Sequence, residues 1–381
     1  MIGGASARRR RAVVLLVVLG MASLVLAACT SPGGPGPVVT VTKTMPPSAA
    51  TDVGTARYFA ATSPWNTKID TASADPNSAT MIAEAAERLG VSELGQSGQG
   101  ISTQYRKVDD THLYVNSQAW TVPVVSGGVP TPIVCRQVQC GDAPATLTLN
   151  IPTDANPDPR YDGWFTVMDT AHHRAYDLWR ARRESDGRIS YQYARIWDLD
   201  GSGYGQPGTQ SARGSGLPLF GGLITAAELQ TGLIQHALAI SVPGPSQKYF
   251  VSPASATDGN GPAGSLPEGA RIRLRADVTP RPPRDPATGK LIKLKAQQQR
   301  TSDAISAALR TYGAIVVDRA AVPSLYAEQG ITPGLLSPSE LQGYSLSDFE
   351  VVTLGKKYTY PLATTEIAAA TPATSTAGSG S

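Results

Sequence analysis

Aromatic and charged side chains gather between residues 164 and 197, in a combination suited to binding sugars. Flat aromatic faces stack on the C–H faces of sugar rings, and charged groups bond the ring hydroxyls. Alternate residues of a strand share a face, so Asp177 and Trp179 lie on one side and Arg180 on the other. A carboxylate beside an aromatic wall can bind or protonate a glycosidic oxygen. The aromatic candidates for stacking are Trp164, Tyr176, Trp179 and Trp197.

Several roles are open for these residues and for two further candidates, Asp258 and His236. Hydrolysis of a glycan needs two carboxylates across the scissile bond, for which Asp177 and Asp258 are the candidates. Elimination instead needs a base, here His236, and a cation such as Arg180 beside a carboxylate-bearing sugar. In a non-catalytic glycan-binding protein we expect the same aromatic residues without converging carboxylates. The aromatic residues also fit the core of an ordinary β-sandwich. On its apolar strand, His236 also fits a hydrogen-bonded core histidine.

The segment Asp198-Leu-Asp200-Gly-Ser202-Gly203 places oxygens at the first, third and fifth positions of a calcium loop. A full EF-hand is excluded because Thr209 occupies the twelfth position, where a bidentate Glu is needed. A partial calcium site and a plain turn closed by Asp and Gly both stay open. Calcium (Ca2+) is therefore the one candidate cofactor, and no motif makes a cofactor a requirement.

The N-terminal residues have the layout of an export signal. A basic stretch from Arg8 to Arg11 precedes an apolar run that ends in Leu26-Ala-Ala-Cys29. This ending is typical of the bacterial lipobox, so we expect cleavage after residue 28, lipidation of Cys29 and anchoring at the outer face of the cell membrane. An ordinary signal peptide and an uncleaved anchor are the alternatives, although the apolar run is short for a full bilayer crossing.

Charge and cysteine content restrict the class of protein. The chain has 33 Lys and Arg against 30 Asp and Glu, and removal of the four signal arginines leaves 29 against 30. A near-neutral protein without a basic stripe is not expected to bind nucleic acid. Cys135 and Cys140 are expected to form a disulfide, since no His or Cys close in sequence completes a zinc site. The expected partners are a polysaccharide and, through the lipid, the membrane.

A single β-rich domain is predicted over residues 54–362, between a Pro/Gly/Thr-rich linker (29–53) and a low-complexity tail (363–381). Short runs of β-branched and aromatic residues, separated by Pro, Gly and Asp-Gly, indicate strands. Many strands with few helices favour an antiparallel β-sandwich or jelly roll decorated by helices. The predicted strands are 121–125, 145–151, 164–169, 175–182, 189–197, 236–242, 248–251, 270–278, 314–317 and 349–354, and helices are predicted after Pro76, after the capping box Thr225–Glu228 and over 302–312.

Five segments form a pattern that extends over most of the predicted domain: Ser63–Asn66, Ser215–Leu223, Ile234–Leu238, Pro267–Leu274 and Ala308–Asp318. This pattern resembles a large uncharacterised family of secreted proteins and lipoproteins from high-GC Gram-positive bacteria, with carbohydrate activity as a candidate role. The resemblance implies export and a β-rich fold, and it places Asp177, His236 and Asp258 at motif positions. Members often carry His after an Asp-Gly pair where this chain has Asp162-Gly163-Trp164. A mechanism that needs that His is therefore not carried over.

Overall fold

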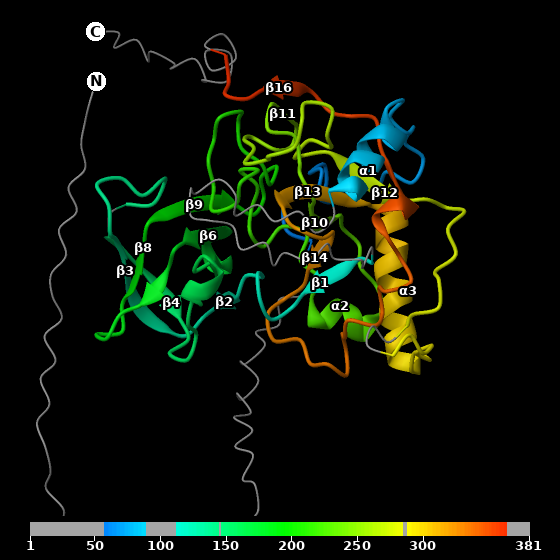
Figure 1. The fold of residues 1–381 in the computed structure, drawn as a ribbon. Helices are drawn as coiled ribbons and strands as arrows, with labels where there is room; N and C mark the ends of the chain where they lie inside the picture. Colours follow the sequence, from blue (N-terminus) through cyan, green and yellow to red (C-terminus); the bar gives the residue numbers. More distant parts are fainter. Residues whose placement is uncertain (1–56, 89–111, 145, 285–287, 364–381) are drawn as a thin grey trace, which may run out of the picture. The chain divides into compact units, whose positions relative to one another are not determined.

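The computed structural model describes residues 57–88, 112–144, 146–284 and 288–363 (Figure 1). These residues belong to one compact unit of the chain, Pro47–Ser381. The predicted signal, the lipidation site Cys29 and the linker lie outside the described residues, as does the tail from residue 364. Within the described part, no helix has the length and apolar character that a membrane span needs.

Strands dominate the described residues and form three larger sheets and one two-stranded ribbon. The largest sheet has the strand order β1-β14-β10-β13-β12-β15. In this sheet β1 runs parallel to β14 and β10 runs parallel to β13, and the other neighbours are antiparallel. Its strands are β1 Tyr114–Asn116, β10 Leu238–Val242, β12 Arg271–Leu274, β13 Ala314–Arg319, β14 Ser324–Tyr326 and β15 Phe349–Val351.

The two four-stranded sheets have the orders β2-β5-β6-β9 and β4-β3-β8-β7. Each contains one parallel pair, β2 with β5 in the first and β3 with β8 in the second. Their strands are β2 Val124–Ser126, β3 Val129–Cys135, β4 Thr146–Ile151, β5 Phe165–Asp169, β6 Arg174–Trp179, β7 Arg182–Arg183, β8 Ile189–Tyr191 and β9 Tyr193–Asp198. The ribbon pairs β11 Tyr249–Val251 with β16 Lys357–Thr359.

The α-helices of the described residues are α1 Ser78–Glu87, α2 Ala226–Thr231 and α3 Ala296–Thr311. The predicted capping box opens α2, because the Thr225 hydroxyl accepts a hydrogen bond from the Glu228 N–H and the Glu228 carboxylate accepts one from the Thr225 N–H. Gly232 ends α2 in the left-handed conformation. The third helix, α3, is longer than the predicted helix over 302–312 and lies against β12.

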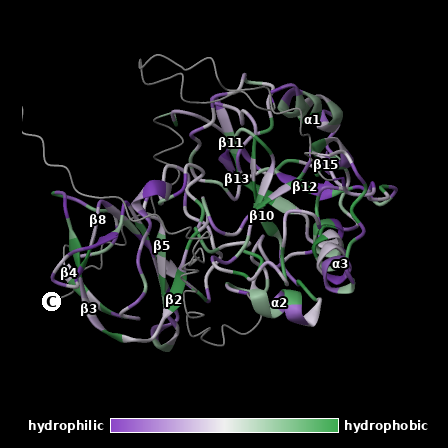
Figure 2. Cartoon of the chain, turned by 60° about the horizontal axis from the view of Figure 1, so that its bottom comes forward, coloured by the Kyte–Doolittle hydropathy of each residue, from purple (hydrophilic) through white to green (hydrophobic). Residues whose placement is uncertain are grey.

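Three hydrophobic cores lie between these elements. The first joins one face of the six-stranded sheet to the helices, the second joins its other face to the β2-β5-β6-β9 sheet, and the third joins that sheet to β4-β3-β8-β7. Alternation explains this division, because Ile240 of β10 belongs to the first core and Ala239 to the second. Likewise Met168 of β5 belongs to the second core and Val167 to the third. Figure 2 shows β10 as a hydrophobic strand, as burial on both faces requires.

The prediction of a mainly β fold is confirmed, and the sheets are mixed. The antiparallel sandwich is not confirmed, because each of the three larger sheets contains at least one parallel pair. Alternation indicates that a segment is a strand, but it does not reveal which neighbour the strand takes. Parallel neighbours need a long crossover connection. Residues 243–313, which include α3, separate β10 from β13.

Two local predictions are confirmed. Cys135, at the end of β3, forms a disulfide with Cys140, and their Cα atoms lie 5.9 Å apart. On β12 the side chains of Ile272 and Leu274 are buried, and the arginines that alternate with them are partly exposed. Both patterns depend on residues close together in the sequence, so the sequence alone suffices to predict them.

Candidate functional site

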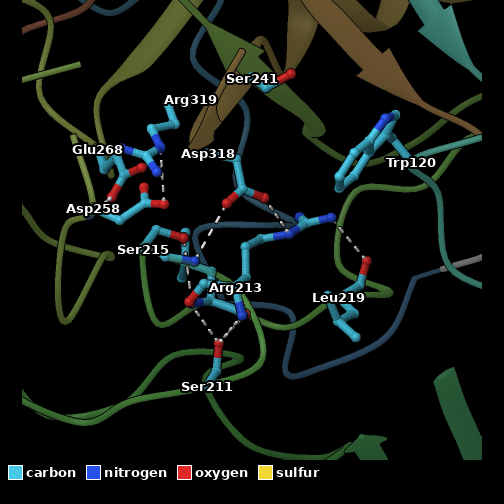
Figure 3. A network of polar contacts seen from close by, with 12 residues as sticks. Trp120, Ser211, Arg213, Ser215, Leu219, Ser241, Asp258, Glu268, Asp318 and Arg319 are labelled. Atoms are coloured by element: carbon cyan, nitrogen blue, oxygen red, sulfur yellow. Dashed lines mark hydrogen bonds and ion pairs between the residues drawn. The ribbon is translucent and has the colours of Figure 1, made fainter. Parts of the chain in front are cut away.

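Three carboxylates converge around β13, from segments far apart in the sequence (Figure 3). Asp318 belongs to β13, Glu268 lies just before β12, and Asp258 lies in the loop after β11. One oxygen of each carboxylate lies within 4.8 Å of those of the other two. Glu268 is fully buried and Asp318 nearly so, whereas the Asp258 side chain is 42% exposed. We refer to these residues as the carboxylate triad; their oxygens could hold a metal ion.

A β-bulge in β13 turns Asp318 toward the other two carboxylates. Val316 and Asp318 pair with consecutive residues of β10, so Val317 is an extra residue in the ladder. Without the bulge Asp318 would share the face of Val316, which lies in the core beneath the helices. With it, Asp318 shares the face of its partner Ser241 and of Ala239, which belongs to the second core. An irregularity of the sheet therefore places this carboxylate.

Two arginines balance part of the negative charge of the triad. The Nε atom of Arg213 lies 3.0 Å from Oδ2 of Asp318, as an ion pair without hydrogen-bond geometry. Arg213 is buried, and its Nη2 donates a hydrogen bond of 3.3 Å to the carbonyl of Leu219. The Nε atom of Arg319 lies 3.4 Å from Oδ2 of Asp258. Three ionised carboxylates and these two arginines would leave one net negative charge.

Burial favours a proton within the triad. Burial raises the pKa of Asp318 to about 7, and the Arg213 guanidinium offsets only part of this effect. Burial, followed by the charges of Asp258 and Asp318, raises the pKa of Glu268 well above its ordinary value. Oε2 of Glu268 accepts a hydrogen bond from the Asp258 N–H, whereas Oε1 has no hydrogen-bond partner among the described residues. One proton held by the triad would bring the net charge of the three carboxyl groups and the two arginines to zero.

Gly214 is the part of the backbone against which Asp258 lies. A Cβ atom at this position would stand 2.3 Å from both Cγ and Oδ1 of Asp258. The N–H of Gly214 also donates a hydrogen bond of 3.3 Å to Oδ1 of Asp318. A side chain at residue 214 would therefore displace the accessible carboxylate of the triad. The close approach, rather than a turn, requires glycine here.

An aromatic cluster lies beside Arg213. Its guanidinium carbon is 4.6 Å from the ring centroid of Tyr326 and 5.5 Å from that of Trp164. The ring of Trp164 contacts the exposed ring of Trp120, with 6.5 Å between the centroids. Figure 3 shows Trp120 on the side to which the Arg213 guanidinium points. An aromatic surface thus adjoins the cation that pairs with Asp318.

Asp177 lies in the core and is not a member of the triad. Its carboxylate accepts hydrogen bonds from the Thr166 hydroxyl at 2.5 Å, the Trp197 indole N–H at 2.8 Å and the Leu219 N–H at 2.7 Å. Burial raises its pKa to about 6, although these bonds act in the opposite direction. A fully buried group with three donors has no access to a substrate. Because Leu219 also accepts a hydrogen bond from Arg213, Asp177 instead positions the segment that holds this arginine.

His236 is a buried, hydrogen-bonded histidine, which was the predicted alternative to a general base. Nε2 lies 2.9 Å from Oε1 of Glu228, and Nδ1 lies 2.9 Å from the carbonyl oxygen of Ala237. Both nitrogens face acceptors, an arrangement that favours a proton on each nitrogen and a cationic ring. Burial lowers the pKa of His236, but the hydrogen bond and the charge of Glu228 outweigh this and raise it overall. A ring committed in this way is a poor general base.

The predicted sugar-stacking residues lie in two different cores. Tyr176 belongs to the third core and Trp179 packs against the second, which confirms that they occupy opposite faces of β6. Arg180 is exposed and follows Trp179, the last residue of β6. Its guanidinium carbon lies 4.6 Å from the ring centroid of Trp179. Trp164 and Trp197 are both buried in the second core. Among these predicted residues, Trp164 is the one whose ring meets Arg213 and so adjoins the triad.

The predicted calcium loop forms a hydrogen-bonded turn. Oδ1 of Asp198 accepts a hydrogen bond from the N–H of Asp200 at 2.9 Å. Oδ2 of Asp200 lies 3.0 Å from Nδ1 of His173, and the Ser202 hydroxyl donates to the carbonyl of Tyr204. These contacts fit the plain turn that the sequence left open. In the part of the chain that the structure describes, the group that could hold a metal is the carboxylate triad instead.

Sequence reasoning missed two members of the triad, Glu268 and Asp318, although both lie in segments that carry the resemblance. The run Ile315-Val-Val-Asp318 offered a signal, because a carboxylate that ends a buried strand needs a compensating partner. No comparable signal marks Glu268 or Arg213. Comparisons with family models, curated proteins and solved structures found no match to this chain. The candidate site therefore rests on its geometry.

Proposed function

We propose that this protein hydrolyses glycosidic bonds of a polysaccharide, with Asp258 and Asp318 as the reacting carboxylates. The observation that carries the proposal is a partly exposed carboxylate next to a nearly buried one, with oxygens within 4.8 Å. Retaining glycosidases hold their two carboxyl groups about 5–5.5 Å apart. Such enzymes need one protonated and one ionised carboxyl group, and different environments produce this division.

The two carboxyl groups take different roles in this proposal. Asp318 donates its proton to the glycosidic oxygen as the bond from that oxygen to the anomeric carbon breaks. Asp258, which water reaches, supplies the carboxylate that attacks the anomeric carbon. A water molecule then adds its oxygen to that carbon, returns one proton to Asp318 and releases Asp258. Glu268 holds the Asp258 backbone N–H and so positions the nucleophile.

The arginines favour hydrolysis over elimination. Elimination needs a cation that meets the carboxylate of a uronic acid, but Arg213 is buried and paired with Asp318. Arg319 is paired with Asp258. Both arginines are thus already paired with carboxylates of the triad, and neither is placed to bind the carboxylates of an anionic polymer. A neutral glycan is therefore the substrate class that we propose, and the converging carboxylates favour an enzyme over a protein that only binds glycans.

Calcium at the triad is a second candidate, favoured by the buried Oε1 of Glu268 that has no hydrogen-bond partner in the described residues. Calcium takes six to eight oxygen ligands, so water or carbonyl groups would have to complete the three carboxylates. Arg213 and Arg319 oppose this occupant, because they already place two positive charges beside the triad. A melting temperature that rises in millimolar CaCl2 and falls in EGTA would favour calcium, and an unchanged one would favour the proton.

The location that we propose is the outer face of the cell membrane, with the lipid on Cys29 as the anchor. The predicted lipobox and the resemblance to exported proteins support this location. The disulfide between Cys135 and Cys140 supports it independently, since such bonds persist in oxidising compartments. Replacement of Cys29→Ala should shift the protein out of the detergent-soluble membrane fraction, which immunoblotting of fractions would detect.

The test of the enzymatic proposal is a panel of neutral plant polysaccharides and actinobacterial wall polysaccharides incubated with the purified protein. We expect new reducing ends without the absorbance of unsaturated sugars. In Asp258→Asn the cleavage rate should fall about 10³-fold while the melting temperature is unchanged, since acid–base and nucleophilic groups contribute effects of this order. Unsaturated sugars would indicate elimination. Retention of a polymer without cleavage would favour a binding protein, and full activity of Asp258→Asn would overturn the site.

A further inference from the structure

Trp120 stands apart from the other four tryptophans of the chain. Its side chain is 49% exposed, whereas Trp65, Trp164 and Trp197 are buried and Trp179 is half-buried. Trp is enriched at binding surfaces, where its ring supplies contact area and its N–H can donate a hydrogen bond. The exposed ring of Trp120 is therefore a candidate contact for a ligand.

The backbone of Trp120 holds the ring in a constrained conformation. Its φ angle is +52°, in the left-handed region that bulky residues rarely adopt. Asn116 donates a side-chain hydrogen bond of 3.3 Å to the Trp120 carbonyl, and the hydroxyl of the buried Thr121 donates one of 2.6 Å to Ala327. The segment is thus fixed on both sides of the strained residue. Strain of this kind persists where the surroundings enforce it, and it is concentrated at functional sites.

Neighbouring rings fix the orientation of the Trp120 side chain. Tyr161 contacts it with 5.6 Å between centroids at an interplanar angle of 62°, and Trp164 contacts it at 6.5 Å and 77°. Both contacts are edge-to-face arrangements, the geometry that aromatic pairs prefer. The ring is consequently preorganised, so that a ligand stacking on it would lose little side-chain entropy.

A continuous series of contacts connects Trp120 to the triad. Trp164 touches Trp120 on one side and the guanidinium of Arg213 on the other, and Arg213 pairs with Asp318. Figure 3 shows the Trp120 ring, the Arg213 guanidinium and Asp318 in this order. A glycan bound with its scissile bond at Asp258 would therefore extend toward this ring. Ser117 and Gln118, which precede Trp120, are polar and suit a hydroxyl-rich ligand better than an apolar protein surface.

We propose that Trp120 is the stacking platform of a sugar-binding subsite, on which one ring of a neutral glycan lies while a linkage further along the same glycan meets the triad. This inference rests on the proposed function, because it assigns the substrate of the same site. The platform contributes to substrate affinity and makes no contact with the reacting atoms. Its loss should therefore raise KM and leave kcat largely unchanged.

The experiment measures retention of the protein in gels that contain the polysaccharides of the panel. All variants carry Asp258→Asn, so that cleavage does not alter the polymer. Trp120→Ala should bind about tenfold more weakly, equivalent to about 1.4 kcal/mol. Trp120→Phe, which keeps a stacking ring, should stay within about threefold of the parent, a range of about 0.7 kcal/mol. Tyr204→Ala is the matched control, because Tyr204 is also an exposed aromatic residue.

The outcomes separate this inference from the proposed function. If Trp120→Ala binds as tightly as its parent while Asp258→Asn abolishes cleavage, the platform is wrong and the hydrolase stands. Binding that depends on Trp120 without any cleavage by the wild-type protein would uphold the platform and overturn the hydrolase. Absence of both binding and cleavage on every polymer would overturn both, and Trp120-dependent capture of a protein would then identify the ring as a protein contact.

Discussion

Asp177 and the carboxylate triad both contain buried carboxyl groups, and the surroundings of these groups differ in kind. Asp177 meets three hydrogen-bond donors, from Thr166, Trp197 and Leu219. The triad places carboxylates against one another, and Oε1 of Glu268 has no hydrogen-bond partner among the described residues. The three donors satisfy the Asp177 carboxylate, whereas the triad contains a buried acceptor without a donor among the described residues. Buried polar groups with all their hydrogen bonds formed stabilise a fold. Carboxyl groups with strongly shifted pKa values are instead common at functional sites.

The sequence around Asp177 explains why the Trp-rich segment was predicted to be functional. Asp177 lies between aromatic residues in the sequence, which resembles a sugar-binding cleft, but β6 points it into the second core. Asp258 has no aromatic neighbour in sequence, yet its side chain is exposed and adjoins an aromatic cluster through Asp318 and Arg213. The candidate site is defined by residues that are close in space. The loops and the β-bulge in β13 bring these residues together.

The largest predicted effect comes from Gly214→Ala. The added Cβ would occupy the place of the Asp258 carboxylate, so we expect cleavage to fall about 10³-fold, as after loss of a catalytic carboxylate. No charge changes, and the partly exposed Asp258 side chain can rotate away, so the melting temperature should stay nearly the same. Gly334→Ala is the control, since a Cβ there meets nothing within 4 Å. An active Gly214→Ala protein would exclude Asp258 from the mechanism.

The second prediction concerns Asp177→Asn. Asparagine would place an NH₂ group against one of the three donors, so a buried donor loses its acceptor. We expect the free energy of unfolding to fall by about 3 kcal/mol, measured by urea denaturation. The exposed Asp186→Asn, which breaks only a surface pair with Arg188, should change it by less than about 1 kcal/mol. Equal stability of both variants would contradict the structural role of Asp177.

Much of the local structure was predictable from the sequence, because neighbours in the chain determine it. The capping box at Thr225, the Cys135–Cys140 bridge and the two faces of β12 all depend on residues within a few positions of one another. The position of Asp318 did not follow, because the extra residue Val317 reverses the face that alternation assigns. No periodicity marks such a bulge.

The candidate site was less predictable than the fold. Asp258, Glu268 and Asp318 come from three segments, and the antiparallel pairing of β12 with β13 brings the last two together. Trp120 lies in a polar stretch with a left-handed backbone, so neither alternation nor propensity indicates its exposure. Arg213 precedes the Gly-rich segment without any motif of its own.

The third prediction concerns the effect of Glu268→Gln on the pH dependence of stability. The folded-state pKa of Glu268 is raised, so wild-type stability falls as pH increases above the ordinary pKa of Glu. The groups facing it are Asp258, Asp318 and the Thr257 hydroxyl. Glutamine does not titrate, so the variant should be more stable than wild type by about 1 kcal/mol at pH 8, with the difference vanishing near pH 4. Urea denaturation at both pH values checks this, and a less stable variant at pH 8 would contradict it.

The smallest predicted effect is the pH dependence contributed by His236. Its pKa is raised in the folded state by Glu228, despite burial and the opposing charge of Arg57. Its stabilisation is therefore complete below the unfolded pKa of about 6.5 and is lost as pH rises through the folded value. In His236→Gln this part of the decline above pH 6.5 should disappear from denaturation curves. A slope identical to that of wild type would show that the ring is not charged in the folded protein.

The most direct test of the account compares Asp177→Asn with Asp258→Asn in one assay of cleavage and one of stability. We predict a reciprocal result: Asp258→Asn loses cleavage of a neutral polysaccharide and keeps its free energy of unfolding. Asp177→Asn loses stability and, at a temperature where it remains folded, keeps most of its cleavage rate. Loss of cleavage in a fully folded Asp177→Asn, with Asp258→Asn still active, would contradict the assignment of the site to the carboxylate triad.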